Sequence, residues 1–86
     1  MNHIAKLYMR QRCHLCEDAK RILKEIQQTF DFSIVEVDID KDERLIELYG
    51  ISIPVIELEG EEIQSGIINK NFVCKAFSEK KIPFSS

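Results

Sequence analysis

The chain has 86 residues, of which 44% are hydrophobic and 31% charged, and its net charge at neutral pH is -3. This length predicts one domain over residues 1–86, because a chain of this size builds a single compact core. Lysine and arginine are scattered among aspartate and glutamate, and no apolar stretch is long enough for a signal peptide or a membrane span. We therefore expect a monomer in the cytoplasm, with neither a nucleic-acid partner nor a membrane partner.

The first half of the chain predicts a strand, a helix and a second strand. Residues 4–9 are apolar at most positions, which is typical of a strand covered on both faces. From residue 15 apolar side chains recur at helical spacing, and they are Leu15, Ala19, Ile22, Leu23, Ile26 and Phe30. Residues 32–38 alternate, with Val35 and Val37 on one face and Glu36 and Asp38 on the other, and this pattern predicts the second strand.

A short second helix follows this strand. Asp40 is placed to cap it, with Glu43 three residues later, and Gly50 offers a left-handed residue at its end. The buried side of this helix is predicted to consist of Leu45, Leu48 and Tyr49.

The last third of the chain predicts a hairpin and a third helix. Residues 54–58 and 62–64 flank a turn that contains Gly60. Phe72, Val73, Ala76 and Phe77 then form the apolar stripe of a helix that begins at residue 69 or 71. The order β-α-β-α-β-β-α predicts an α/β fold, with a four-stranded mixed sheet and helices on both faces.

The segment Cys13-His14-Leu15-Cys16 places two cysteines where the first strand meets the first helix. Unpaired N–H groups and the helix dipole favour a thiolate at Cys13, which makes it the expected nucleophile. Cys16 can then resolve the mixed disulfide from within the same turn. Arg10 and Arg12 should stabilise the anion, and His14 would do so when it is protonated.

Two other interpretations of the cysteine pair stay open. In the first, both residues are small buried hydrophobes, and the chain is a binding or adaptor module without turnover. Alternatively the pair belongs to a zinc or iron–sulfur carrier, although Cys74, His14 and His3 form no second ligand cluster in the sequence. We predict no metal and no tightly bound cofactor, and we expect Cys74 to serve in packing.

A second motif, Ser52-Ile53-Pro54, lies where the second helix gives way to a strand. Together with the element order and the C-x-x-C segment it resembles glutaredoxins and the smallest thioredoxin-like proteins over nearly the whole chain. The resemblance implies a thioredoxin-like fold of glutaredoxin type and a cis bond before Pro54. It also implies that the backbone N–H and C=O of Ile53 pair with an incoming disulfide-bearing chain.

The resemblance is partial at the positions that hold glutathione in glutaredoxins. Arg10 matches a common lysine, but the Gly-Gly pair of the family becomes Ser65-Gly66, and no acidic residue follows Gly66 within the next three positions. The buried acid of thioredoxins corresponds to Leu7. We therefore expect an oxidoreductase of cell redox homeostasis that reduces protein or small-thiol disulfides and is recycled by a thiol reductant or a reductase. Glutathione is a candidate reductant, but its specific recognition is in doubt.

Overall fold

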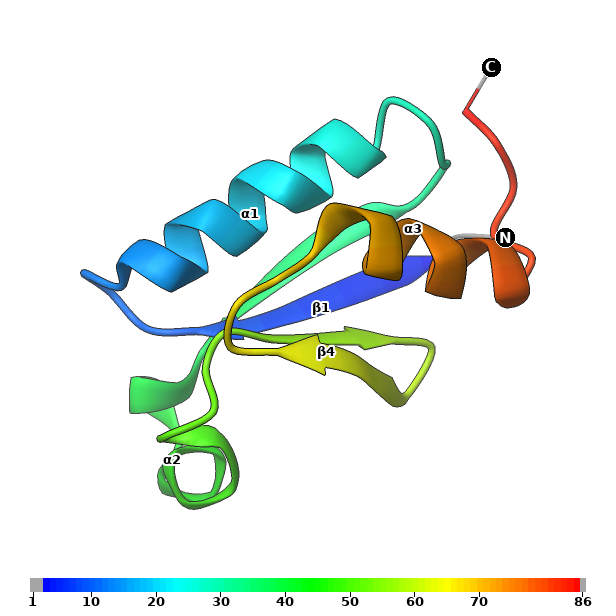
Figure 1. The fold of residues 1–86 in the computed structure, drawn as a ribbon. Helices are drawn as coiled ribbons and strands as arrows, with labels where there is room; N and C mark the ends of the chain where they lie inside the picture. The colour runs from blue at the N-terminus through cyan, green and yellow to red at the C-terminus, as the bar shows by residue number, and fades with distance from the viewer. Residues whose placement is uncertain (1–2, 86) are drawn as a thin grey trace.

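The computed structural model describes residues 3–85. Its elements, in chain order, are β1 (Ile4–Met9), α1 (His14–Ile26), β2 (Ser33–Asp38), a 3-10 turn η1 (Ile39–Lys41), α2 (Glu43–Tyr49), β3 (Val55–Leu58), β4 (Glu61–Ser65) and α3 (Lys70–Glu79). Figure 1 shows α1 and α3 on one face of the sheet and α2 on the other. The predicted α/β architecture is confirmed.

The sheet has four strands in the order β2-β1-β3-β4. β1 pairs in parallel with β2 and antiparallel with β3, so the strand that leads to the cysteines lies inside the sheet. The hairpin between β3 and β4 turns at Glu59 and Gly60, whose φ angles of 52° and 84° are both positive. Two consecutive residues of this kind form the tight turn that matches the twist of a hairpin.

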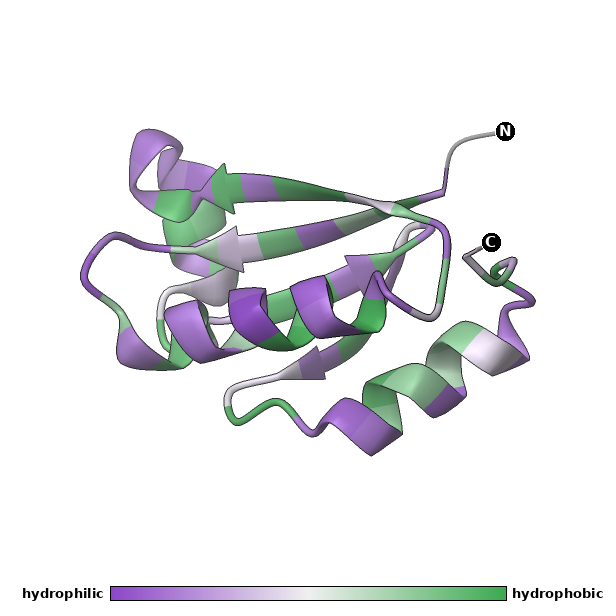
Figure 2. Cartoon of the chain, turned by 90° about the horizontal axis from the view of Figure 1, so that it is seen from above, coloured by the Kyte–Doolittle hydropathy of each residue, from purple (hydrophilic) through white to green (hydrophobic). Residues whose placement is uncertain are grey.

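The core lies in two parts. The larger cluster fills the space between the sheet and the helix pair α1 and α3, and includes Leu7, Leu23 and Phe77. The smaller cluster joins Tyr8, Ile39 and Val55 beneath α2. Seen from above in Figure 2, hydrophobic and hydrophilic segments alternate along α1 and α3, as expected of helices that bury one side only.

The second helix differs from its prediction because η1 precedes it. Ile39 is buried, and the Asp38 side chain accepts the N–H of Asp40, so that residues 39–41 form a separate turn. The cap of α2 is therefore Asp42, which accepts the N–H of Arg44 at 2.9 Å, and the prediction of Asp40 is wrong. Gly50 has φ −51° and is right-handed, which also corrects the prediction.

Three residues of the predicted apolar stripes are exposed, and one of them is Leu15, which is 42% exposed on the first turn of α1. Leu48 is 68% exposed, because α2 has only seven residues and packs against the sheet through Leu45 and Tyr49. Phe72 is 52% exposed, while Val73 and Phe77 carry the packing of α3. The apolar stripes of all three helices are therefore narrower than the sequence pattern indicated.

The helices within residues 3–85 include none with the length and apolar character needed to cross a membrane.

Candidate active site at the start of α1

Cys13 and Cys16 lie at the junction between β1 and α1, as predicted. Cys13 is the N-cap of α1, with an extended backbone (φ −119°, ψ 109°), and its Sγ accepts the backbone N–H of Cys16 at 3.2 Å. Both are free thiols. One of the unpaired amides at the helix start therefore points at the Cys13 sulfur, which is an arrangement that stabilises negative charge there.

The two sulfurs differ in their surroundings. Cys13 is half-buried, whereas Cys16 is only 3% exposed. Burial raises the pKa of Cys16 to about 12, and the hydrogen bond with Cys13 adds to the increase, while a backbone hydrogen bond from Arg10 opposes it. Cys16 is thus a neutral thiol at neutral pH, and Cys13 is the sulfur that an incoming molecule meets.

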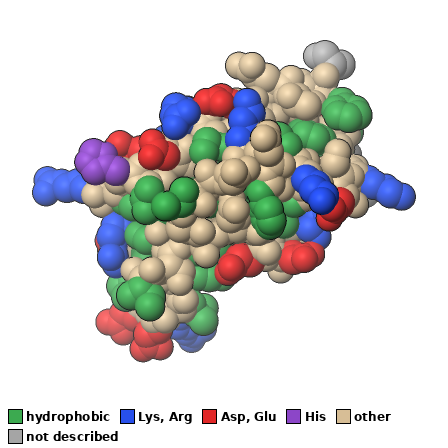
Figure 3. Space-filling model, in the orientation of Figure 1, with side chains coloured by type: hydrophobic (Ala, Val, Ile, Leu, Met, Phe, Trp, Pro, Cys, Tyr) green, Lys and Arg blue, Asp and Glu red, His purple; other side chains and the backbone are tan. Residues whose placement is uncertain are grey.

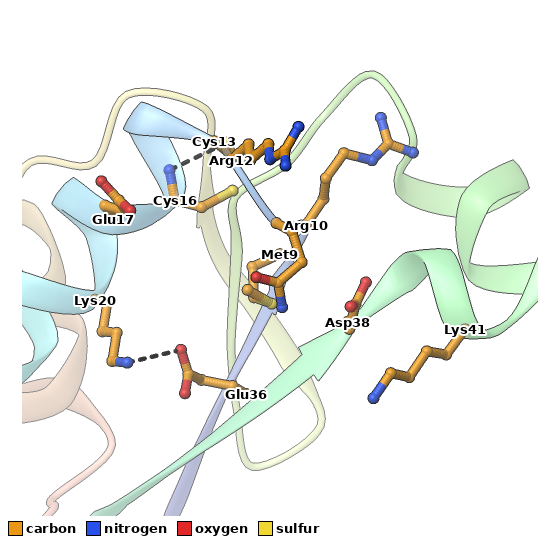
Figure 4. Close-up of a pocket in the computed structure, with 11 residues that line it drawn as sticks. Met9, Arg10, Arg12, Cys13, Cys16, Glu17, Lys20, Glu36, Asp38 and Lys41 are labelled. Atoms are coloured by element: carbon orange, nitrogen blue, oxygen red, sulfur yellow. Dashed lines mark hydrogen bonds and ion pairs between the residues drawn. The ribbon is translucent and has the colours of Figure 1, made fainter.

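A hollow of about 330 Å³ opens beside the cysteines, between the start of α1 and the carboxyl end of β2. Figure 4 shows the residues around it. Its lining consists of Met9, Arg10, Gln11, Arg12, Cys13, Cys16, Glu17, Lys20, Glu36, Asp38 and Lys41. Most of these side chains are charged, so the hollow suits a polar ligand or an ordered group of waters.

Arg10 and Arg12, which we predicted beside the nucleophile, both line the hollow but differ in role. The Arg10 guanidinium is bound by Asp40 at 2.8 to 3.1 Å, and this carboxylate raises the pKa of Arg10. In Figure 4 the guanidinium extends away from the cysteines. Arg12 has a positive φ of 58° and no ion-pair partner within residues 3–85, so its charge remains available at the mouth of the hollow.

The far side of the hollow holds charged residues that the sequence did not single out. Lys20 Nζ lies 3.2 Å from Glu36 Oε1, which joins α1 to β2 across the hollow. Asp38 and Lys41 complete this side. The alternating pattern of residues 32–38 placed Glu36 and Asp38 on one face, but only the pairing of β2 with β1 brings that face to the cysteines.

The other predicted site residues lie outside the hollow. His14 is exposed as the first residue of α1. The bond between Ile53 and Pro54 is cis, and Pro54 is buried. The Ile53 N–H already donates to the Tyr49 carbonyl at 3.1 Å, because residues 49–53 form a tight turn after α2. The prediction that Ile53 presents a free N–H and C=O pair is therefore wrong for the N–H.

Gly66 adopts a positive φ of 75°, and its N–H donates to the Pro54 carbonyl at 2.9 Å. This bond places the loop after β4 against the loop before β3. Cys74 is half-buried at the edge of the larger core cluster, away from the hollow.

Metal ligation is one of the two other interpretations of the cysteine pair. No group of three or more His, Cys, Asp or Glu side chains converges in the described part of the chain. A metal or cluster at Cys13 and Cys16 would need ligands from another molecule.

Comparison with known proteins places the chain in a family. Residues 5–82 match the model of the Glutaredoxin-like domain family (DUF836). The chain belongs to this glutaredoxin-like family. The match spans both cysteines, the cis Pro54 and all four strands, and confirms the resemblance found in the sequence.

Solved structures agree with this assignment. A structural genomics target protein from X. campestris is 26% identical with a TM-score of 0.76, and the match covers 87% of this chain and 96% of that one. A protein from Nitrosomonas europaea is also 26% identical, with a TM-score of 0.78 and coverage of 88% and 92%. No curated protein matches the sequence.

A mutant thioredoxin from Halobacterium salinarum has the same fold. It is 16% identical with a TM-score of 0.68, and the match covers 91% of this chain and 74% of that one. At this identity the likeness shows the fold alone. The glutaredoxin-like chain therefore has a thioredoxin-like fold with a cysteine pair at the start of α1.

Proposed function

We propose that this glutaredoxin-like protein is a thiol–disulfide oxidoreductase that reduces protein or small-thiol disulfides through Cys13 and Cys16. The observation that carries the proposal is the hydrogen bond from the Cys16 N–H to the Cys13 sulfur at a helix N-terminus. A sulfur in this position is favoured as a thiolate, which is the form that attacks disulfides. The three free thiols also fit the reducing cytoplasm in which we propose that it works.

The reaction has two steps. The Cys13 thiolate attacks one sulfur of the substrate disulfide, a Cys13–substrate disulfide forms, and the other substrate sulfur leaves as a thiolate that takes up a proton. Cys16 then loses its proton and attacks Cys13, which releases the second substrate thiol and leaves a Cys13–Cys16 disulfide. Two electrons pass to the substrate, and a thiol reductant such as glutathione, or a reductase, returns them.

Exposed apolar side chains support contact with protein substrates. Ile51 and Ile67 are 103% and 79% exposed on the two loops that Gly66 and Pro54 hold together, and Leu15 is 42% exposed between the cysteines. Figure 3 shows hydrophobic side chains at the surface among charged ones on the face that it views. Such residues offer contact area to the chain around a substrate disulfide.

The test uses a chromogenic aromatic disulfide, whose thiolate product absorbs visible light, in a single turnover. The reduced wild-type protein should release two aromatic thiolates, the first as Cys13 attacks and the second as Cys16 resolves. Cys13→Ser should abolish both releases at this site. Cys16→Ser should give the first release only and retain the adduct, which mass spectrometry detects.

Cys74→Ser is the matched control, since it removes a thiol that lies away from the hollow. This variant should keep both releases from the pair. Slow reaction of Cys13, at the rate of an ordinary exposed thiol, would instead support the non-catalytic adaptor and overturn the proposal. Insulin, tested in parallel, shows whether a protein disulfide is also reduced.

A further inference from the structure

The second step requires a proton acceptor for Cys16. This thiol is almost completely buried, and its sulfur must become an anion before it can attack Cys13. The strand beneath it supplies no acceptor, because the β1 residues that face α1, Ala5 and Leu7, are apolar and fully buried. The acceptor must therefore come from another element around the hollow.

The register of the sheet places Glu36 on the face that α1 covers. Glu36 is the partner of Leu7 in the parallel pairing of β1 and β2. Partnered residues on neighbouring strands point to the same face of a sheet, so Glu36 rises on the α1 face, one strand outward from Leu7. It lines the same hollow as Cys16.

Lys20 fixes the Glu36 carboxylate in that position. Lys20 is four residues after Cys16 on α1, so both side chains lie on the same side of the helix. Its Nζ lies 3.2 Å from Glu36 Oε1, and Figure 4 shows this pair across the hollow from the Cys16 sulfur. The ion pair therefore faces the space that the Cys16 proton would enter.

The other two carboxylates in the lining are less suitable. Asp38 uses its Oδ1 to accept the N–H of Asp40 at 3.0 Å as the cap of η1. Glu17 and Glu36 are both exposed, but in Figure 4 the Glu17 carboxylate points away from the cysteine sulfurs. Glu36 is the remaining carboxylate of the hollow.

We propose that Glu36, held by the positioning residue Lys20, accepts the proton of Cys16 in the resolving step. This proposal rests on the proposed oxidoreductase function. The Cys16 S–H bond breaks, and the proton passes through water in the hollow to the Glu36 carboxylate. The Cys16 thiolate then bonds to Cys13 Sγ, the bond between Cys13 and the substrate sulfur breaks, and the departing substrate thiolate takes up a proton from Glu36 or solvent.

Other charged groups that face this space set its electrostatic background. Lys20 and Glu17 come from α1, Arg10 and Arg12 from the segment between β1 and α1, Asp38 from β2 and Lys41 from η1. Of the cations among them, Lys20 is paired with Glu36, while the Arg10 guanidinium is paired with Asp40. Once Cys13 is bonded to substrate, its hydrogen bond and charge no longer oppose ionisation of Cys16.

The test separates the two releases of the chromogenic disulfide in a rapid-mixing experiment on the full chain. In Glu36→Gln the first release should match wild type, while the second should slow by at least about tenfold near neutral pH. The second rate of wild type should change little between about pH 6 and pH 8, whereas that of Glu36→Gln should rise by about tenfold per pH unit, because hydroxide must then remove the proton.

Two variants complete the experiment. Glu36→Asp keeps a carboxylate and should restore the shallow pH profile, whereas Glu25→Gln removes a carboxylate paired with Lys70 and Arg21 outside the hollow and should leave both releases unchanged. A second release in Glu36→Gln with the wild-type rate and pH profile would overturn the proposal, as would equal slowing of both releases. Failure of wild type to give the first release would instead refute the oxidoreductase function.

Discussion

The two cysteines of the pair occupy different environments although only two residues separate them. Cys13 is half-buried at the N-cap of α1, where the Cys16 N–H points at its sulfur, and Cys16 is buried on the first turn. In the proposed reaction this difference gives the attacking role to the first sulfur and the resolving role to the second. The assignment follows from exposure and hydrogen bonding, without reference to any substrate.

Alkylation of the reduced protein should therefore be selective. Since burial raises the pKa of Cys16 to about 12, its thiolate is scarce at about pH 8, and iodoacetamide should modify it at least about a hundredfold more slowly than in the unfolded chain. Cys13 should be modified first. Peptide mass spectrometry of samples quenched over time measures both rates.

The control is the same labelling in denaturant, where all three cysteines should react at similar rates. The rate at Cys16 should rise as the pH approaches 12, because its thiolate then accumulates. Labelling of Cys16 in the folded protein at the rate of the unfolded chain would contradict the assignment.

At the scale of elements, helix caps decide where the helices begin. Asn69 caps α3, and its Oδ1 accepts the Phe72 N–H at 3.0 Å. The sequence left Asn69 and Asn71 as alternatives for this start. Asn69 is the cap because its backbone is extended (φ −106°, ψ 118°), which lets its side chain accept this hydrogen bond.

Substitution of Asn69 by alanine should lower the free energy of unfolding by about 1 kcal/mol, because the Phe72 N–H loses its partner. Urea denaturation followed by circular dichroism measures the change. Asn71→Ala is the matched control, since Asn71 is exposed within the first turn of α3 and should have little effect on stability. Equal effects of the two substitutions would show that the cap contributes nothing.

The sequence predicted all four strands and all three helices because their apolar periodicity is strong. It was least accurate between residues 38 and 50, where the outcome depends on packing between distant segments. The Asp40 carboxylate accepts hydrogen bonds from Arg10, 30 residues earlier. Ile39 is buried next to Tyr8 and Val55. Gly50 is required for space: a Cβ there would lie 2.5 Å from the Ile46 carbonyl oxygen.

The whole molecule brings together a site that the sequence contains only in part. Cys13, Cys16, Arg10 and Arg12 are close in sequence and were predicted from local spacing. Lys20 and Glu36 meet only because β2 pairs with β1 in one register while α1 crosses the same face, as the ion pair between them shows. Local patterns could not reveal this side of the hollow, because it depends on tertiary structure.

Stability at high pH is a property of the whole fold, since two buried groups must keep their protons. Burial, with the nearby Glu57 carboxylate, raises the pKa of Tyr8 to about 12, and burial raises that of Cys16 to about 12. The unfolded chain loses these protons near pH 9 to 10, before the folded chain does. The stabilisation is therefore complete below about pH 9 and is lost as the pH approaches 12.

In Tyr8→Phe the free energy of unfolding should fall less steeply between about pH 10 and pH 12 than in wild type. The slopes of the two proteins should differ by at most about 1.4 kcal/mol per pH unit. Urea denaturation at several pH values measures these slopes. Asn71→Ala is the control, because it removes no ionisable group from an exposed position, and its slope should follow wild type. Parallel slopes for wild type and Tyr8→Phe would contradict the prediction.

The hydrogen bond that caps α1 has a practical consequence for work in solution. The Cys16 N–H donates a hydrogen bond to Cys13 Sγ. This sulfur changes its covalent partner at each stage of the proposed reaction. The nuclear magnetic resonance signal of the Cys16 N–H should therefore take a distinct position for the reduced, substrate-bound and oxidised chains. A single backbone proton thus offers a label-free record of how far a turnover has advanced.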